Sequence, residues 1–155
     1  MRVLYFLNLV ISALALSTTS AHVLEYPQKI KLDIPAYTLI NSNLYKFFAL
    51  VGGLYCIGAI VLALILVYVS RKQRNILRWN FWGLAFHLLW LVSWILIVNS
   101  VNSQIVDNPD AAHQLWEQLR YRWEYGHIVG FVFHLGAFCC LTIGALNMGR
   151  DRIDH

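Results

Sequence analysis

Two short motifs pair a carboxylate with an imidazole at a spacing of three residues. Glu124 precedes His127, and His22 precedes Glu25 in the reverse order. Residues i and i+3 share one face of a helix, so each motif places its two side chains together. Two such motifs on neighbouring helices suit a carboxylate–imidazole metal site, although the di-iron pattern needs two further glutamates that the chain does not offer at that depth. The alternative is a hydrogen-bonded polar cluster, including Arg120, that orders a bundle.

Aromatic and amide side chains surround the second motif. Helical spacing predicts one continuous stripe, made of Trp116, Arg120, Trp123, His127, Gly130 and His134. Trp116 and Trp123 are candidate ligand-binding residues, and an interfacial aromatic belt is the alternative. Asn99 and Asn102, at the end of the preceding apolar segment, either bind a polar ligand or cap that end by hydrogen bonding.

Histidines also occur deeper in the apolar segments. His87 and His134 are expected at similar depths, which leaves open a bis-histidine haem. The alternative is that a neighbouring hydroxyl or carbonyl satisfies each ring. The three cysteines all fall within apolar segments and are read as small packing residues rather than a disulfide framework. The sequence therefore predicts no cofactor, with metal and haem kept as open alternatives.

The composition indicates an integral membrane protein. The 155 residues are 59% hydrophobic and 13% charged, with a mean hydropathy of +0.56, whereas soluble domains carry about 25% charged residues. The apolar residues fall into four blocks; the last three are near the length of about 20 residues that a membrane crossing needs, and the first is marginal. We expect an all-α, four-helix transmembrane bundle in a single domain, residues 1–155, with spans at about 3–21, 47–69, 79–99 and 126–147.

The basic residues predict the orientation. Arg71, Lys72, Arg74 and Arg78 lie around the short link between the second and third blocks, and Arg2, Arg150 and Arg152 flank the first and fourth. Positive residues favour the cytoplasmic side, so both termini are expected there, in a bacterial-type plasma membrane. The formal charge of +4 then reflects topology and gives no support for a nucleic-acid partner. Alternatively, residues 1–21 form a cleaved signal peptide, because "TSA" precedes His22.

Capping signals predict two helix starts outside the membrane. Asp33 before Pro35 indicates that the second helix begins ahead of its apolar block. Asn108 can cap a helix with Pro109 at its first position. No strong breaker follows, because a glycine such as Gly126 costs only about 1 kcal/mol in a helix. One long helix, Pro109–Leu146, is therefore expected.

Three stretches resemble the DUF1772 family of small integral membrane proteins, which includes the anthrone oxygenases. They are "AHVLEYPQKIKL…AYTLINSNLY", "VNSVNSQIVDNP" and "W-x2-LR-x-RWEYGH". The matching positions are Ala21 to Lys29, Asn102, Trp116, Leu119, Arg120, Arg122, Trp123, Glu124 and His127. The resemblance implies a four-helix membrane unit and a retained first helix. His87 and His134 are not part of the family block.

Two functions are compatible with these residues. The resemblance implies a cofactor-independent oxidoreductase that acts on a polycyclic phenol or a quinone-like molecule. In that scheme His127 beside Glu124 is the base and Arg120 stabilises the oxyanion, with His22, Glu25, Asn99, Asn102, Trp116 and Trp123 around the ligand. The alternative is a non-catalytic module that binds a lipid or a quinone, or an accessory subunit of a membrane complex. Membrane lipids are the expected surroundings, and the oligomeric state stays open.

Overall fold

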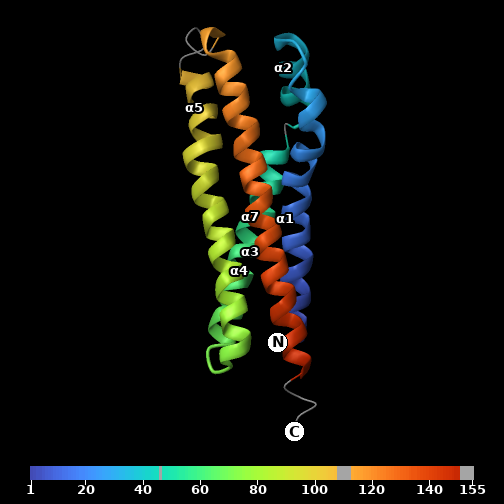
Figure 1. Cartoon of the computed structure of the whole chain (residues 1–155), viewed down its shortest axis with the longest axis vertical. Coiled ribbons are helices and arrows are strands. Elements are labelled where there is room, and N and C mark those ends of the chain that lie inside the picture. The colour runs from blue at the N-terminus through green and yellow to red at the C-terminus, as the bar shows by residue number, and fades with distance from the viewer. Residues whose placement is uncertain (46, 108–112, 151–155) are drawn as a thin grey trace.

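The chain forms a bundle of long helices in a computed structural model that describes residues 1–45, 47–107 and 113–150 (Figure 1). In chain order the elements are α1 (Arg2–Lys29), α2 (Ile34–Asn43), the π-helical segment η1 (Phe48–Gly52), α3 (Gly53–Val69), α4 (Arg74–Ser93), the π-helical segment η2 (Trp94–Asn99), α5 (Ser100–Asp107) and α7 (Trp116–Arg150). All regular elements in the described ranges are helical, which confirms the predicted all-α fold.

Four helical stretches are long and apolar enough to cross a membrane. They are Arg2–Lys29, Phe48–Val69, Arg74–Ile105 and Trp116–Met148. Each contains one of the expected apolar blocks, but the first, third and fourth run several residues beyond it. A helix does not have to end at the edge of the hydrocarbon core. It can continue beyond that edge until a turn or a capping residue ends it.

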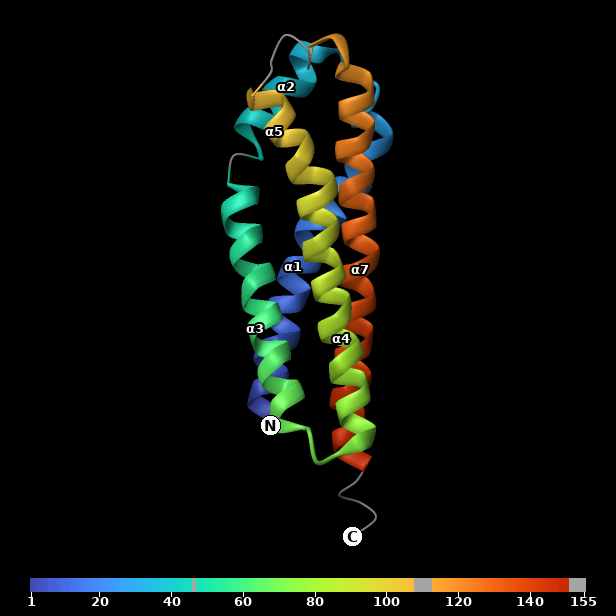
Figure 2. The ribbon, with the colours of Figure 1, turned by 90° about the vertical axis from the view of Figure 1, so that its left-hand side faces the viewer.

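The four long helices form a ring of neighbours. Helix α1 packs against α3 and α7, and α4 packs against the same two helices. Figure 2 shows the N-terminus, the α3–α4 loop and the C-terminal end of α7 at one end of the bundle, with α2 and α5 at the other. We call these ends the terminal end and the α2 end.

The bundle is apolar outside and partly polar inside. Large apolar side chains such as Val3, Phe6 and Leu54 are exposed on its outer surface, whereas Asn8 and Asn80 are fully buried. Lipid tails are as apolar as leucine, so close packing and interhelical hydrogen bonds hold such helices together. Buried polar side chains are therefore expected at the helix contacts.

Glycines set the closest approach between α4 and α7. A Cβ atom at Gly83 would lie 2.7 Å from Leu141 Cγ, and one at Gly126 would lie 2.7 Å from Val98 Cγ2. Gly126 is helical, as predicted. Gly126 lies against Val98 of η2, so a side chain there would push α7 and η2 apart.

Two helix boundaries differ from the sequence expectation. Helix α7 begins at Trp116 after a turn at Leu115, so the single helix Pro109–Leu146 was wrong at its start. Asn108 and Pro109 lie outside the described residues. Asp33 does start a helix, since its side chain accepts from Ala36 N at 2.9 Å. That helix ends at Asn43, however, and the second span begins separately at η1.

Candidate functional site

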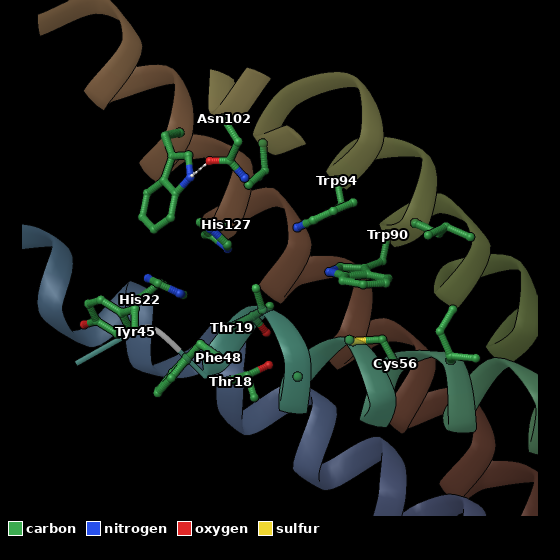
Figure 3. A pocket seen from close by; sticks show the side chains of 17 residues that line it. Thr18, Thr19, His22, Tyr45, Phe48, Cys56, Trp90, Trp94, Asn102 and His127 are labelled. Atoms are coloured by element: carbon green, nitrogen blue, oxygen red, sulfur yellow. Dashed lines mark hydrogen bonds between the residues drawn. The ribbon is translucent and has the colours of Figure 1, made fainter. Parts of the chain in front are cut away.

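A pocket of about 310 Å³ lies within the α2 half of the bundle. Helix α1, η1, α3, α4, η2 and α7 all contribute to its wall, which is mostly apolar (Figure 3). The aromatic side chains on the wall include Phe48, Trp90, Trp94 and Trp123, and the polar ones include His22, His127, Cys56 and Asn102. Ile57 of α3 also lines the pocket and is 51% exposed.

His22 of α1 and His127 of α7 stack against each other on the pocket wall. Their ring centroids are 4.0 Å apart with an interplanar angle of 19°. The Trp123 indole contacts both rings edge-on, and Tyr45 and Phe48 contact His22 from the other side. Two cations this close in an apolar setting would repel strongly, so the pair holds at most one positive charge.

Each imidazole keeps one buried nitrogen without a hydrogen-bond partner. These atoms are His22 Nδ1 and His127 Nε2. Seven other residues in the described ranges also have a buried polar side-chain atom without a hydrogen bond, but none of them lines the pocket. An unpaired buried polar atom is costly, about 1–3 kcal/mol. Both rings line the pocket, so a molecule bound there is one source of the missing hydrogen bonds.

Both π-helical segments flank this pocket. Phe48, Ala49 and Gly52 of η1 line one side, and Trp94 and Val98 of η2 line the other. A π-helical turn disturbs the regular backbone hydrogen bonds and is found frequently at functional sites. The two π-helical segments belong to two different spans, and both lie at the pocket.

A buried salt bridge lies beside the histidine pair, toward the α2 end. Lys29 Nζ is 3.1 Å from Glu124 Oε1, and the two side chains are 3% and 0% exposed. The Tyr37 hydroxyl of α2 donates to the same oxygen at 2.7 Å. Burial raises the pKa of Tyr37 above its usual range, and the Glu124 carboxylate adds to this rise, so Tyr37 remains the donor. The salt bridge and the hydrogen bond together join α1, α2 and α7.

Aromatic rings surround the Lys29 ammonium. It lies 4.3 Å from the Tyr45 ring centroid, 4.8 Å from that of Trp123 and 5.2 Å from that of Tyr37. Cation–π contacts of this kind contribute about 2 kcal/mol or more when the cation is desolvated. Lys29 therefore has both an anion and three ring faces to offset its burial.

Arg120 takes a structural position instead of facing the pocket. It donates to Leu32 O at 2.7 Å and pairs with Glu117 Oε2 at 2.6 Å. Sequence reasoning had placed Arg120 in the polar cluster around the two motifs, but it is Lys29 that pairs with Glu124. The guanidinium instead fixes the chain between α1 and α2 against α7.

The other candidate residues are dispersed. Asn102 lines the pocket and accepts from Trp123 Nε1 at 3.0 Å. Trp116 packs edge-on against Tyr37, with ring centroids 5.4 Å apart, and does not reach the pocket. Glu25 and Asn99 are exposed and lie off the pocket wall.

The two carboxylate–imidazole motifs do not converge on a common point. Their histidines stack, but Glu124 turns to Lys29 and Glu25 is exposed. Among the residues that the structure describes, no three metal-ligating side chains come together. The motif spacing placed the correct histidines on facing helices, while their carboxylates have other partners.

Sequence reasoning missed Lys29 and Tyr45 as neighbours of the histidine pair. Lys29 follows His22 by seven residues, two helical turns, and so shares its face of α1. That spacing was a usable signal for Lys29. Tyr45 lies between α2 and η1, where no periodicity applies, and nothing in its local sequence marks it.

A second polar group occupies the bundle centre, with one side chain from each long helix. Ser12 of α1, Cys56 of α3, His87 of α4 and His134 of α7 are linked by contacts of 3.2–3.4 Å. His87 Nδ1 and His134 Nδ1 are 3.3 Å apart. The two rings touch directly, so a haem between them would require their separation. Cys56 also lines the pocket and connects this group to it.

Four long apolar helices around buried polar side chains define an integral membrane protein of the helical-bundle class. No family model, curated protein or solved structure matches the chain. The functional argument therefore rests on the site itself.

Proposed function

We propose that the protein binds a planar, lipid-soluble aromatic molecule with a phenolic or quinone-type oxygen in this pocket. The observation that carries the proposal is the stacked pair of imidazoles on the wall of a mostly apolar pocket, each with one unpartnered nitrogen, His22 Nδ1 and His127 Nε2. A ligand oxygen near both atoms would supply the hydrogen bonds they lack.

The shape and lining of the pocket support a flat ring system. Its volume of about 310 Å³ is at the lower end of the range for small-molecule sites. Trp90, Trp94 and Phe48 present ring faces and edges, which pair favourably with aromatic ligands. Entry past the half-exposed Ile57 would suit a molecule that partitions into the membrane.

Catalysis is the second step of the proposal, and the resemblance to the anthrone oxygenases motivates it. In that reaction anthrone and molecular oxygen give anthraquinone and water, after a base removes a ring proton. His127 is the candidate base, because its ring lines the pocket and its Nε2 has no hydrogen-bond partner. Arg120, which the family scheme assigns to the oxyanion, is held by Leu32 and Glu117, so His22 takes this role here. Non-catalytic binding of the same ligand class is the competing outcome.

Binding can be measured through the tryptophans of the pocket. Purified protein in detergent would be titrated with 1-naphthol and followed by tryptophan fluorescence, and bound small molecules would be identified by mass spectrometry. His127→Ala should weaken binding about tenfold, by loss of a hydrogen bond and of ring contacts. Tyr125→Phe is the control, because Tyr125 packs on Tyr26 at the protein surface.

Three outcomes decide between the alternatives. Equal loss in both variants, or no saturable binding by the wild type, would contradict the proposal. Saturable binding that depends on His127, with no turnover of anthrone in air, would favour the non-catalytic module. Conversion of anthrone to anthraquinone that is lost in His127→Ala would establish the oxygenase.

A further inference from the structure

The polar group at the bundle centre forms a hydrogen-bonded chain with one direction. In order it runs Cys56 Sγ, His134 Nε2 (3.4 Å), His134 Nδ1 to His87 Nδ1 (3.3 Å), His87 Nε2 to Ser12 Oγ (3.2 Å) and Ser12 Oγ to Asn8 Oδ1 (2.9 Å). Each imidazole contacts a different neighbour through each of its two nitrogens. All five side chains are buried.

The terminal amide fixes the direction. Asn8 Oδ1 can only accept, so the Ser12 hydroxyl donates to it and must itself accept from His87 Nε2–H. A neutral His87 then accepts at Nδ1 from His134 Nδ1–H. A neutral His134 in turn accepts at Nε2, and its partner there is the Cys56 thiol.

The direction of this hydrogen-bonded chain determines what Cys56 offers to a ligand in the pocket. The Cys56 proton points to His134, away from the pocket, so the sulfur offers only lone pairs to a ligand. Trp90 covers His134 with ring centroids 4.7 Å apart, and Cys56 is the one member of the hydrogen-bonded chain that lines the pocket. The pocket wall at Cys56 therefore accepts hydrogen bonds and does not donate them.

The distance between the two polar ends of the pocket suits a para-substituted ring. His127 and His134 are seven residues apart on α7, about 10 Å along the helix axis, and Cys56 lies beside His134. Two oxygens in para positions are about 5 Å apart, and a hydrogen bond adds about 3 Å at each end. A para-dihydroxylated ring can therefore reach the histidine pair and the cysteine together.

We propose that the pocket selects an aromatic para-diol, a hydroquinone, with one oxygen on His22 and His127 and the opposite hydroxyl donating to Cys56 Sγ. This inference rests on the proposed binding function and names its substrate class. His134, His87 and Ser12 are positioning residues, which hold the thiol proton away from the ligand.

Three ligands on one ring system test the proposal under nitrogen, with tryptophan fluorescence as the readout. They are 1,4-dihydroxynaphthalene, 1-naphthol, and 4-methoxy-1-naphthol, whose ether oxygen cannot donate. The wild type should bind the diol about three- to tenfold more tightly than either of the others, as one added hydrogen bond allows. Cys56→Ala should abolish this preference, and Cys56→Ser should retain it, because a hydroxyl can fill both roles of the thiol.

Two matched controls separate the hydrogen bond to Cys56 from general packing effects. Cys140→Ala removes another buried thiol of the bundle, outside the pocket, and should keep the preference. Ser12→Ala should reduce the preference for the diol, because the Ser12 hydroxyl no longer fixes which nitrogen of His87 carries the proton. Ser93→Ala should not, because Ser93 only donates to Trp90 O of its own turn.

The failure of this inference differs from that of the binding proposal. Absence of binding by all three ligands overturns both. Binding of 1-naphthol without preference for the diol, or an equal loss for all ligands in Cys56→Ala, overturns the hydroquinone inference alone. If Cys56→Ala does not fold, the same ligand ratios in Ser12→Ala and Ser93→Ala decide the matter, and equal ratios overturn it.

Discussion

Replacing Lys29 by methionine should strongly destabilise the bundle. The change keeps an unbranched apolar stem but leaves the fully buried Glu124 carboxylate without its cation. Breaking a buried ion pair on one side costs about 3–5 kcal/mol. Tyr37 still donates to Glu124 in the variant, so the lower end of that range, about 3 kcal/mol, is expected.

A double-mutant cycle isolates the interaction between the two charges. Lys29→Met and Glu124→Gln would be made singly and together, and their free energies of unfolding measured in mixed micelles by denaturant titration. The double variant should recover most of the loss, because neither charge is then buried alone. Glu117→Gln is the exposed control, since the Glu117 side chain is 66% exposed in its pair with Arg120, and it should cost about 1 kcal/mol or less.

The cycle can refute the reasoning clearly. A loss for Lys29→Met no larger than that for Glu117→Gln would mean that solvent reaches Lys29 and Glu124. A double variant as unstable as the sum of the single ones would mean that the two side chains do not interact. Either result would mean that the Lys29–Glu124 salt bridge does not stabilise the contact between α1 and α7.

Three further predictions concern topology, processing and pH. Reporter fusions after Asp154 and within residues 104–107 should place the C-terminus in the cytoplasm and the second position outside, and an external C-terminus would reverse the orientation. N-terminal sequencing of the purified protein should find α1 retained, because α1 supplies Asn8 and Ser12 to the bundle centre; a chain that begins at His22 would contradict this. Since the pKa of Tyr37 is raised above its usual 10.0, its contribution to stability is fully present below pH 10 and is lost as the pH rises further. Tyr37→Phe should therefore lose less stability than the wild type between pH 9 and 11, and parallel losses would argue against the Glu124 contact.

The sequence predicted the spans and the facing histidines well, because both depend on local patterns. Apolar blocks of membrane-crossing length need no tertiary information. The spacings around His22 and His127 placed both rings at the same end of their helices. Their contact at 4.0 Å follows from that depth together with the pairing of α1 and α7.

The partners of the charged residues depended on helix rotation, which a single sequence does not encode. Glu124 can meet any cation that faces it at the same depth, and both Arg120 and Lys29 were available. The π-helical segments η1 and η2 likewise arise within apolar stretches, and η2 contains neither glycine nor proline. Cys56 was read as a packing residue because it lies within an apolar segment, and its contact with His134, 78 positions away, leaves no local signal in the sequence.

What separates the histidine pair from the other buried polar groups is where its unmet hydrogen bonds lie. Lys29 and Glu124 form a salt bridge, and Tyr37 of α2 donates a hydrogen bond to the Glu124 carboxylate. The central chain satisfies both nitrogens of His87 and of His134. A polar group whose needs are met inside the protein can order a bundle without any ligand. His22 and His127 stack without a hydrogen bond between them, their rings line the pocket, and each ring keeps one nitrogen without a partner. Because an unmet hydrogen bond in an apolar setting is costly, this arrangement favours a molecule that enters from the membrane and completes the pair.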